Sequence, residues 1–138
     1  MGTEEAESGQ EGADGLGDTL GFTDYEHLAV DEASMRLPVG PRVLQPYGIV
    51  HGGAYAAMAE SLTSRATYET VGPDNVAFGQ GNDTSFLRPV FGGSVHAEAR
   101  AKHRGSTTWV WEVEMRDDDD KLCAVSRVTI AVRPFRRS

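Results

Sequence analysis

The feature that most limits how this chain can fold is a change of hydrophobic period near residue 75. Before it, residues 52–70 carry small and apolar side chains at helical spacing, which predicts one long helix. After it, apolar and polar residues alternate one by one in several short runs, which is typical of half-buried strands. One strand before the helix and four after it indicate an α+β domain with a single helix against an antiparallel sheet.

The predicted elements are bounded by residues that interrupt regular structure. A first strand is expected within residues 21–37, followed by Pro38, and Gly72 and Pro73 are expected to end the helix. The helix is rich in alanine, so a curved sheet could wrap closely around it as the one central helix. The later strands are expected at residues 76–87, 95–101, 109–115 and 122–132.

The acidic character of the chain is concentrated at its start. The formal net charge is −8, yet residues 1–36 hold ten acidic residues against one base, and the rest of the chain holds eleven acids and twelve bases. Residues 1–20 are rich in Gly, Glu and Asp and poor in large apolar side chains, so we predict a disordered acidic tail. One folded domain is expected over residues 21–138.

Composition also argues against several classes of partner. A nearly neutral body lacks the basic stripe that faces a phosphate backbone, so no nucleic acid is expected. No apolar run is long enough to span a bilayer and no secretory signal is visible, so we expect no membrane partner and a cytoplasmic location. Cys123 is the single cysteine and lies in an apolar run, where a buried hydrophobe is expected rather than a nucleophile. The aspartates at 117–120 predict a solvated turn; no metal and no cofactor are expected.

A His-Gly-Gly motif opens the predicted helix. The first turn after His51 presents backbone N–H groups that have no partner within the helix, and Gly52 and Gly53 keep the approach to them open. An oxygen that gains negative charge during acyl transfer would be stabilised there. Glu60 follows a little over two turns later among small apolar residues, where a carboxylate is costly to bury without a partner. Ser64 lies one turn beyond it on the same face.

This spacing, with Gln45 preceding the motif, resembles that of the hotdog-fold acyl-CoA thioesterases. The resemblance is to the branch of phenylacetyl-CoA, Arthrobacter-type 4-hydroxybenzoyl-CoA and 1,4-dihydroxy-2-naphthoyl-CoA thioesterases. A second block, which begins with Ser-Phe-Leu-Arg-Pro-Val at residue 85, resembles the next part of the same family. The resemblance implies the hotdog fold and hydrolysis of an acyl-CoA, with an aromatic or medium-sized acyl group, to free acid and CoA.

The same resemblance assigns roles to five residues. Glu60 would be the nucleophile or the general base, and the sequence leaves both routes open. The Gly52 amide would polarise the thioester carbonyl, and His51 would shape that pocket. Gln45 would orient the carbonyl or the water, and Ser64 would position the water or the carboxylate. The alternative for His51, Gln45 and Ser64 is a structural role as helix cap, turn residue and helix polar group.

The resemblance also suggests where the nucleotide end of CoA binds, since guanidinium and imidazole groups suit phosphates. Basic residues near turns can equally be only solvated. Phe86 and Leu87 stand where family members often carry His or Asn, which puts a polar substrate contact from that strand in doubt. The predicted CoA contacts are Arg88, His103, Arg104, Gly105 and Ser106.

Assembly follows from the resemblance as well. A homodimer is expected, with a homotetramer as a dimer of dimers and the active site at the junction of two chains, because a single curved sheet leaves strand edges to be covered. Trp109 and Trp111 share one face of a strand, where core or interface packing is expected rather than ligand stacking. Two other functions stay open: a non-catalytic acyl-CoA-binding hotdog protein, and a hotdog enoyl-CoA hydratase or dehydratase.

Overall fold

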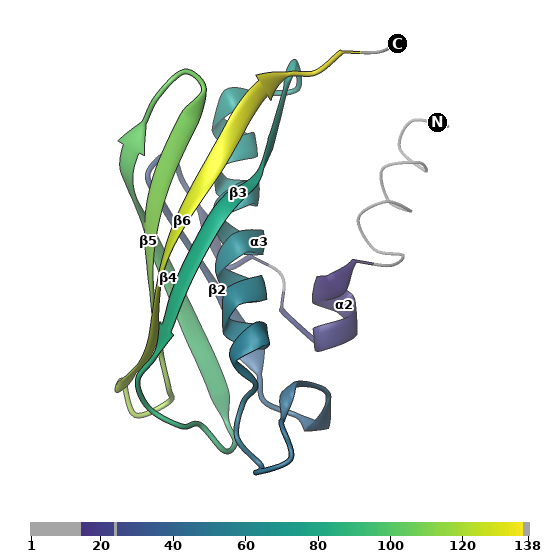
Figure 1. Ribbon diagram of the computed structural model, residues 1–138, viewed down its shortest axis with the longest axis vertical. Helices are drawn as coiled ribbons and strands as arrows, with labels where there is room; N and C mark the ends of the chain where they lie inside the picture. The colour runs from purple at the N-terminus through teal and green to yellow at the C-terminus, as the bar shows by residue number, and fades with distance from the viewer. Residues whose placement is uncertain (1–14, 24, 137–138) are drawn as a thin grey trace.

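The protein is one long helix packed against one antiparallel sheet (Figure 1). The computed structural model describes residues 15–23 and 25–136. The sheet has six strands in the order β1-β2-β4-β5-β6-β3, and each neighbouring pair is antiparallel. The elements are α2 (Leu16–Leu20), β1 (His27–Leu28), β2 (Glu32–Pro38), η1 (Pro41–Val43), α3 (Gly52–Val71), β3 (Asn75–Phe86), β4 (Ser94–Arg104), β5 (Thr108–Arg116) and β6 (Leu122–Pro134). This arrangement confirms the predicted α+β architecture.

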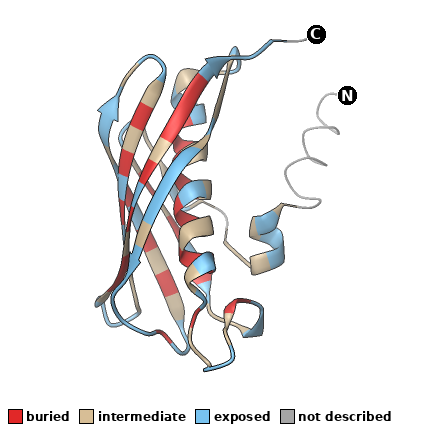
Figure 2. Ribbon diagram, in the orientation of Figure 1, coloured by how far each residue is buried: buried red, intermediate tan, exposed pale blue. Residues whose placement is uncertain are grey.

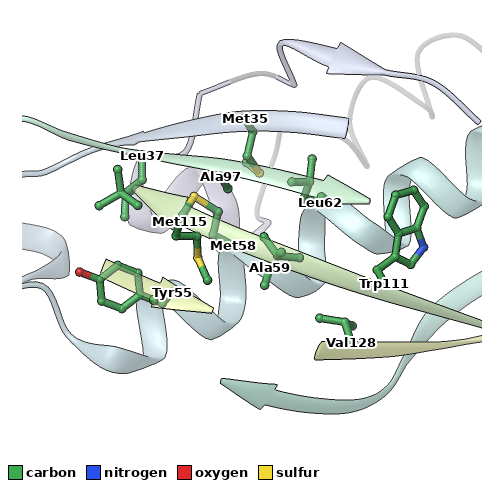
Figure 3. Packing of buried hydrophobic residues seen from close by; sticks show 14 of the residues in the cluster. Met35, Leu37, Tyr55, Met58, Ala59, Leu62, Ala97, Trp111, Met115 and Val128 are labelled. Atoms are coloured by element: carbon green, nitrogen blue, oxygen red, sulfur yellow. The ribbon is translucent and has the colours of Figure 1, made fainter. Parts of the chain in front are cut away.

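The core lies between α3 and the sheet face that curves around it (Figure 2). In β5, Trp109, Trp111, Val113 and Met115 are buried while the residues between them are not, as the alternation predicts. These side chains meet apolar residues of α3 such as Leu62 (Figure 3). Burying one such side chain completely stabilises the fold by about 1.5–3 kcal/mol.

Three polar side chains inside this core, those of Trp111, Thr67 and Cys123, are hydrogen-bonded. The Trp111 indole Nε1 donates to the Thr67 hydroxyl at 2.9 Å, and that hydroxyl donates to the Thr63 carbonyl at 2.7 Å. The Cys123 thiol is buried and donates to the Met115 carbonyl at 3.0 Å, and burial raises its pKa. A buried thiol held as the neutral form is a packing group, which confirms the prediction for Cys123.

Two predictions about boundaries need correction. Residues 15–20 do not belong to a disordered tail: α2 is a short helix that packs near α3, while residues 1–14 lie outside the described residues. Within residues 21–37, the two short strands β1 and β2 form a hairpin in place of the one predicted strand. Between β2 and α3, Pro41–Val43 form the 3-10 turn η1. Each of these segments is short, so the sequence pattern is too brief to define it.

The acidic turn between β5 and β6 is built by its own side chains. The Asp117 carboxylate accepts hydrogen bonds from the amides of Asp119 and Lys121, both at 2.9 Å, and Asp120 has a positive φ of 64°. Asp118 instead pairs with His96 at 2.7 Å. Among the residues that the structure describes, no group of His, Cys, Asp or Glu is arranged to hold a metal ion.

Strand β3 forms one edge of the sheet and pairs with β6. The register places Gly79 opposite Ile130 and Asn82 opposite Val128, both core residues of β6, so Gly79 and Asn82 face α3. A bulge between Gly79 and Gly81 shifts this register. Bulges bend a strand locally and are common next to functional sites.

Candidate active site

The first turn of α3 presents an unpaired backbone donor. His51 caps the helix: its Nδ1 accepts a hydrogen bond from the Gly53 amide at 2.9 Å, and its carbonyl accepts one from the Ala54 amide at 3.0 Å. Within the described part of the chain, the Gly52 amide donates to no acceptor. The twenty-residue helix adds its dipole at this end, so Gly52 offers a site for a negatively charged oxygen.

A cavity of about 660 Å³ lies beside this donor. A tight turn carries Gln45 to the cavity wall. The backbone N–H of Gln45 donates to the Ile49 carbonyl, and the backbone carbonyl of Gln45 accepts a hydrogen bond from the Gly48 N–H, both at 2.8 Å. Gly48 has a φ of 83°, which glycine adopts without strain. The cavity is lined by Gln45, Ile49, Val50, His51, Gly52, Gly53, Tyr55, Phe86, Leu87, Arg88 and Pro89.

Aromatic side chains close one side of the cavity. A Cβ added to Gly52 would lie 2.6 Å from the Phe86 Cζ, so the ring occupies the space that a side chain at 52 would need. The Tyr55 ring lies 6.0 Å from that of Phe86, centroid to centroid. The Tyr55 hydroxyl is buried next to the Cys123 thiol but makes no hydrogen bond of ordinary geometry among the described residues, and burial, followed by the neighbouring thiol, raises its pKa above the usual range.

Glu60 and Ser64 lie further along α3, on the side that faces away from the core. Glu60 is exposed and Ser64 is half-buried. The Glu60 carboxylate rests against β3, because a Cβ added to Gly79 would lie 2.6 Å from its Cδ. Eight residues separate Gly52 from Glu60, which is about 12 Å along a helix. Within one chain, Glu60 is therefore not part of the cavity wall.

The five predicted CoA contacts separate into two places. Arg88 lies in the cavity wall, in the loop after β3. His103 and Arg104 end β4, and Gly105 and Ser106 follow in the turn to β5, at the end of the sheet opposite the start of α3 (Figure 1). Arg104 lies over the Trp109 ring, 6.0 Å from its centroid. One chain alone does not bring these residues to the cavity.

Several residues at this site carry little signal in the sequence. Phe86 stands out only as a departure from the family pattern, and no local pattern marks Tyr55. Asn82 donates through Nδ2 to the Ala56 carbonyl at 2.9 Å and so ties β3 to α3 one turn before Glu60. Gly79 provides the space for Glu60. A signal existed for Gly79, since glycines inside a predicted strand mark a bulge or a close approach of another group.

The arrangement offers two functional groups that acyl transfer needs. Gly52 supplies a backbone donor at a cavity with largely apolar walls, and Glu60 supplies a carboxylate on the outward face of the same helix. A donor of this kind stabilises an oxyanion, and a carboxylate can attack a carbonyl or activate water.

Comparison with known proteins gives one consistent family. A model described as the thioesterase superfamily matches residues 47–124. A 1,4-dihydroxy-2-naphthoyl-CoA hydrolase from Listeria monocytogenes is 36% identical over 125 residues, covering 89% of this chain and 99% of the relative. An Escherichia coli protein of the same name is 34% identical over 120 residues, covering 86% and 88%. The crystal structure of a thioesterase from Haemophilus influenzae matches with a TM-score of 0.84 at 31% identity, covering 92% of this chain and 88% of that one.

Proposed function

The chain belongs to the thioesterase superfamily and is an acyl-CoA thioesterase with the hotdog fold, and on that basis we propose which residues carry out the hydrolysis. Glu60 supplies the reacting carboxylate, and the Gly52 amide polarises the thioester carbonyl. The observation that carries this proposal is the free Gly52 amide at the start of a long helix, beside a cavity large enough for an acyl group. Relatives named as hydrolases favour this function over a non-catalytic acyl-CoA-binding protein or a hydratase.

We propose that each site takes Gly52 from one chain and Glu60 from a second copy. A carbonyl bound at Gly52 is about 12 Å along the helix from Glu60 of its own chain, too far for one acyl carbon to meet both. Ala56 lies midway between Gly52 and Glu60 along the helix. If a two-fold axis passes at the level of Ala56, the helix of a second copy runs antiparallel to this one. Glu60 of the second copy then lies at the level of Gly52 of the first. The exposed edge strand β3 supports such a pairing, since Phe78 is half-exposed on it.

The same symmetry gives the far hairpin a role. An antiparallel copy brings its β4–β5 hairpin to the end of the dimer at which this chain has its cavity. His103, Arg104, Gly105 and Ser106 of the second copy would then lie at the same end as Arg88, and together these residues would bind the phosphates of CoA. The homotetramer and the cytoplasmic location stay predictions. Among the described residues, no helix is long and apolar enough to cross a bilayer.

The chemistry can follow either of two routes. In one, a Glu60 oxygen attacks the acyl carbon, the carbon–sulfur bond breaks, CoA leaves as the thiolate and water hydrolyses the mixed anhydride. In the other, Glu60 takes a proton from a water molecule whose oxygen attacks the acyl carbon, the carbon–sulfur bond then breaks, and the proton passes to the departing thiolate to give CoA and the free acid. In both, the carbonyl oxygen becomes negative beside the Gly52 amide. Gln45 in the cavity wall orients the carbonyl or the water, His51 shapes the pocket, and Ser64 positions the water or the carboxylate.

The acyl group is proposed to be aromatic or medium-sized. Ile49, Tyr55, Phe86, Leu87 and Pro89 give the cavity an apolar wall with two aromatic rings. Apolar pockets of this size bind compact apolar groups by removing their surface from water. Two similar proteins carry the name of an aromatic acyl-CoA hydrolase, which supports the same class of substrate.

The test is a thiol-release assay over a panel of acyl-CoA thioesters, from short aliphatic to phenylacetyl and hydroxybenzoyl. Glu60→Gln should lower kcat by about 10²–10⁴-fold, because it removes the base or nucleophile and keeps the shape of the side chain. Glu69→Gln is the matched control on the same helix, since among the described residues Glu69 forms an ion pair with Arg65 alone, at the surface. Full turnover by Glu60→Gln would remove Glu60 from the mechanism.

A mixing experiment tests the shared site. Glu60→Gln and Gly52→Ala are each expected to be weakly active alone. If each site takes Gly52 from one chain and Glu60 from the other, mixed dimers made by co-expression contain one intact site and recover activity. A lack of recovery in purified mixed dimers would show that the two residues do not act across chains.

A further inference from the structure

The backbone conformation at position 79 does not require a glycine. Gly79 lies within β3, and the described glycines with positive φ are Gly21, Gly48, Gly72 and Gly93. A residue with a side chain could therefore adopt the backbone conformation at 79 without strain. Glycine also weakens a strand, because it has no side chain to pack. The reason for glycine here must be the space that it leaves.

That space is filled by Glu60. A Cβ built on Gly79 would lie 2.6 Å from the Glu60 Cδ and 2.9 Å from its Cγ, both far inside ordinary van der Waals contact. Gly79 faces α3, since it stands opposite the core residue Ile130 in the ladder. The carboxylate therefore lies directly over the backbone of the edge strand.

Gly81, two residues further along the same bulge, differs from Gly79. It stands opposite Thr129, and a Cβ there would meet the Thr129 Cβ and Oγ1 at 3.8 and 3.9 Å, which is ordinary contact. The two glycines thus share a strand and a bulge, but only Gly79 adjoins the carboxylate.

The strand is fixed against the helix close to this point. The Asn82 side chain donates to the Ala56 carbonyl at 2.9 Å, and the Thr84 hydroxyl donates to the Asn82 Oδ1 at 2.7 Å. Thr84 in turn shares a 2.7 Å hydrogen bond with Ser126 of β6. The backbone at residue 79 is therefore held at a set distance from Glu60 by contacts that do not involve Glu60 itself.

We propose that Gly79 is a positioning residue that fixes the direction of the Glu60 carboxylate. The proposal rests on the proposed role of Glu60 in hydrolysis. With glycine at 79 the carboxylate lies along the edge strand, the edge at which the second copy is proposed to pair. With any side chain at 79, Glu60 must turn out toward solvent. The fold would tolerate this change, because Glu60 is exposed, but the reacting oxygen would move.

The experiment compares Gly79→Ala with Gly81→Ala in the full-length protein. Gly79→Ala should lower kcat for acyl-CoA hydrolysis by about 10²-fold with little change in KM, as a displacement of about 1 Å does for a catalytic group. Gly81→Ala should keep kcat near that of the unsubstituted protein. Both variants should keep their thermal midpoint and their oligomeric state, which separates positioning from a folding defect.

Shortening the carboxylate gives a second readout. Glu60→Asp removes one methylene and with it the carboxylate atoms nearest to a methyl group at 79, so the clash is reduced to the carbon at the Cγ position, 2.9 Å away. Gly79→Ala should therefore lower kcat by a much smaller factor when it is added to Glu60→Asp than when it is made in the unsubstituted protein. Equal costs in the two backgrounds, or equal kcat values for Gly79→Ala and Gly81→Ala, would overturn the proposal.

Crystal structures of the two alanine variants test the positioning role of Gly79 separately from the catalytic role of Glu60. The Glu60 carboxylate should be displaced in Gly79→Ala and unchanged in Gly81→Ala, whatever the activity. An undisplaced carboxylate in Gly79→Ala would refute the steric argument. If the carboxylate is displaced while Glu60→Gln keeps full activity, the catalytic role of Glu60 fails, and with it the positioning role.

Discussion

Replacing Gly52 by alanine tests the donor at the start of α3. A Cβ at 52 would lie 2.6 and 2.9 Å from the Cζ and Cε1 of Phe86. Carbon atoms pack at about 3.5–4.0 Å, so the ring must withdraw by about 1 Å, and its displacement narrows the cavity beside the Gly52 amide. We expect kcat/KM for acyl-CoA hydrolysis to fall by about 10²-fold.

The stability of Gly52→Ala should change far less than its activity. Overpacking costs about 1–3 kcal/mol, and the better helix propensity of alanine offsets up to about 1 kcal/mol of this. Phe86 is 57% exposed, so it can move without opening a hole in the core. Urea unfolding should therefore show a loss of about 0–2 kcal/mol.

Two further variants make the result interpretable. Gly53→Ala is the matched comparison, because a Cβ there meets the His51 ring at 3.2 Å and beyond and does not meet Phe86, so its kcat/KM should fall less than that of Gly52→Ala. Adding Phe86→Leu to Gly52→Ala removes the clashing ring atoms and should restore part of the lost activity. Equal kcat/KM for the variants at 52 and 53 would refute the argument that hydrolysis needs the open space beside the Gly52 amide.

Three other predictions concern the core and the surface. Thr67→Val removes the acceptor of the buried Trp111 indole and should cost about 1–3 kcal/mol in urea unfolding, whereas an unchanged midpoint would contradict the hydrogen bond. Tyr55→Phe removes a buried hydroxyl without a described partner, so stability should stay within about 1 kcal/mol or rise; a large loss would show that the hydroxyl is bonded. The hydrogen bond from His96 lowers the pKa of Asp118, so the carboxylate stabilises the fold above the pKa of an unfolded aspartate, about 4. The stability difference between the unsubstituted protein and Asp118→Asn should therefore be present at pH 6 and disappear as the pH falls through the lowered pKa, and a difference that persists in acid would exclude this cause.

The sequence by itself determined the elements of the fold. The helix predicted at residues 52–70 spans Gly52–Val71, and each of the four later strands lies within a few residues of its predicted bounds. The burial of Trp109 and Trp111 followed from the same alternation. These features could be predicted because hydrophobic periodicity is set by neighbours within one or two turns of the chain. The short hairpin of β1 and β2 and the helix α2 carry too few residues for such a pattern.

The site was only partly determined in this way. The His-Gly-Gly motif predicted a helix start with a free donor, and the structure has His51 as the cap and Gly52 at the cavity. The motif could not show that Glu60 lies outside that cavity within one chain. Nor could it show that the hairpin at residues 103–106 lies at the far end of the sheet, because the strand order decides where each hairpin goes.

Only the tertiary structure placed β3 at the edge of the sheet, with Gly79 beneath the Glu60 carboxylate and Phe86 beside Gly52. Each of these contacts joins residues about twenty to thirty-five positions apart, on a helix and on the strand that follows it. A local pattern records which residues face the core, but it does not record which strand pairs with which, or how far two packed elements stand from one another. Those quantities depend on the simultaneous packing of the whole sheet against one helix, and they decide where the carboxylate and the donor lie.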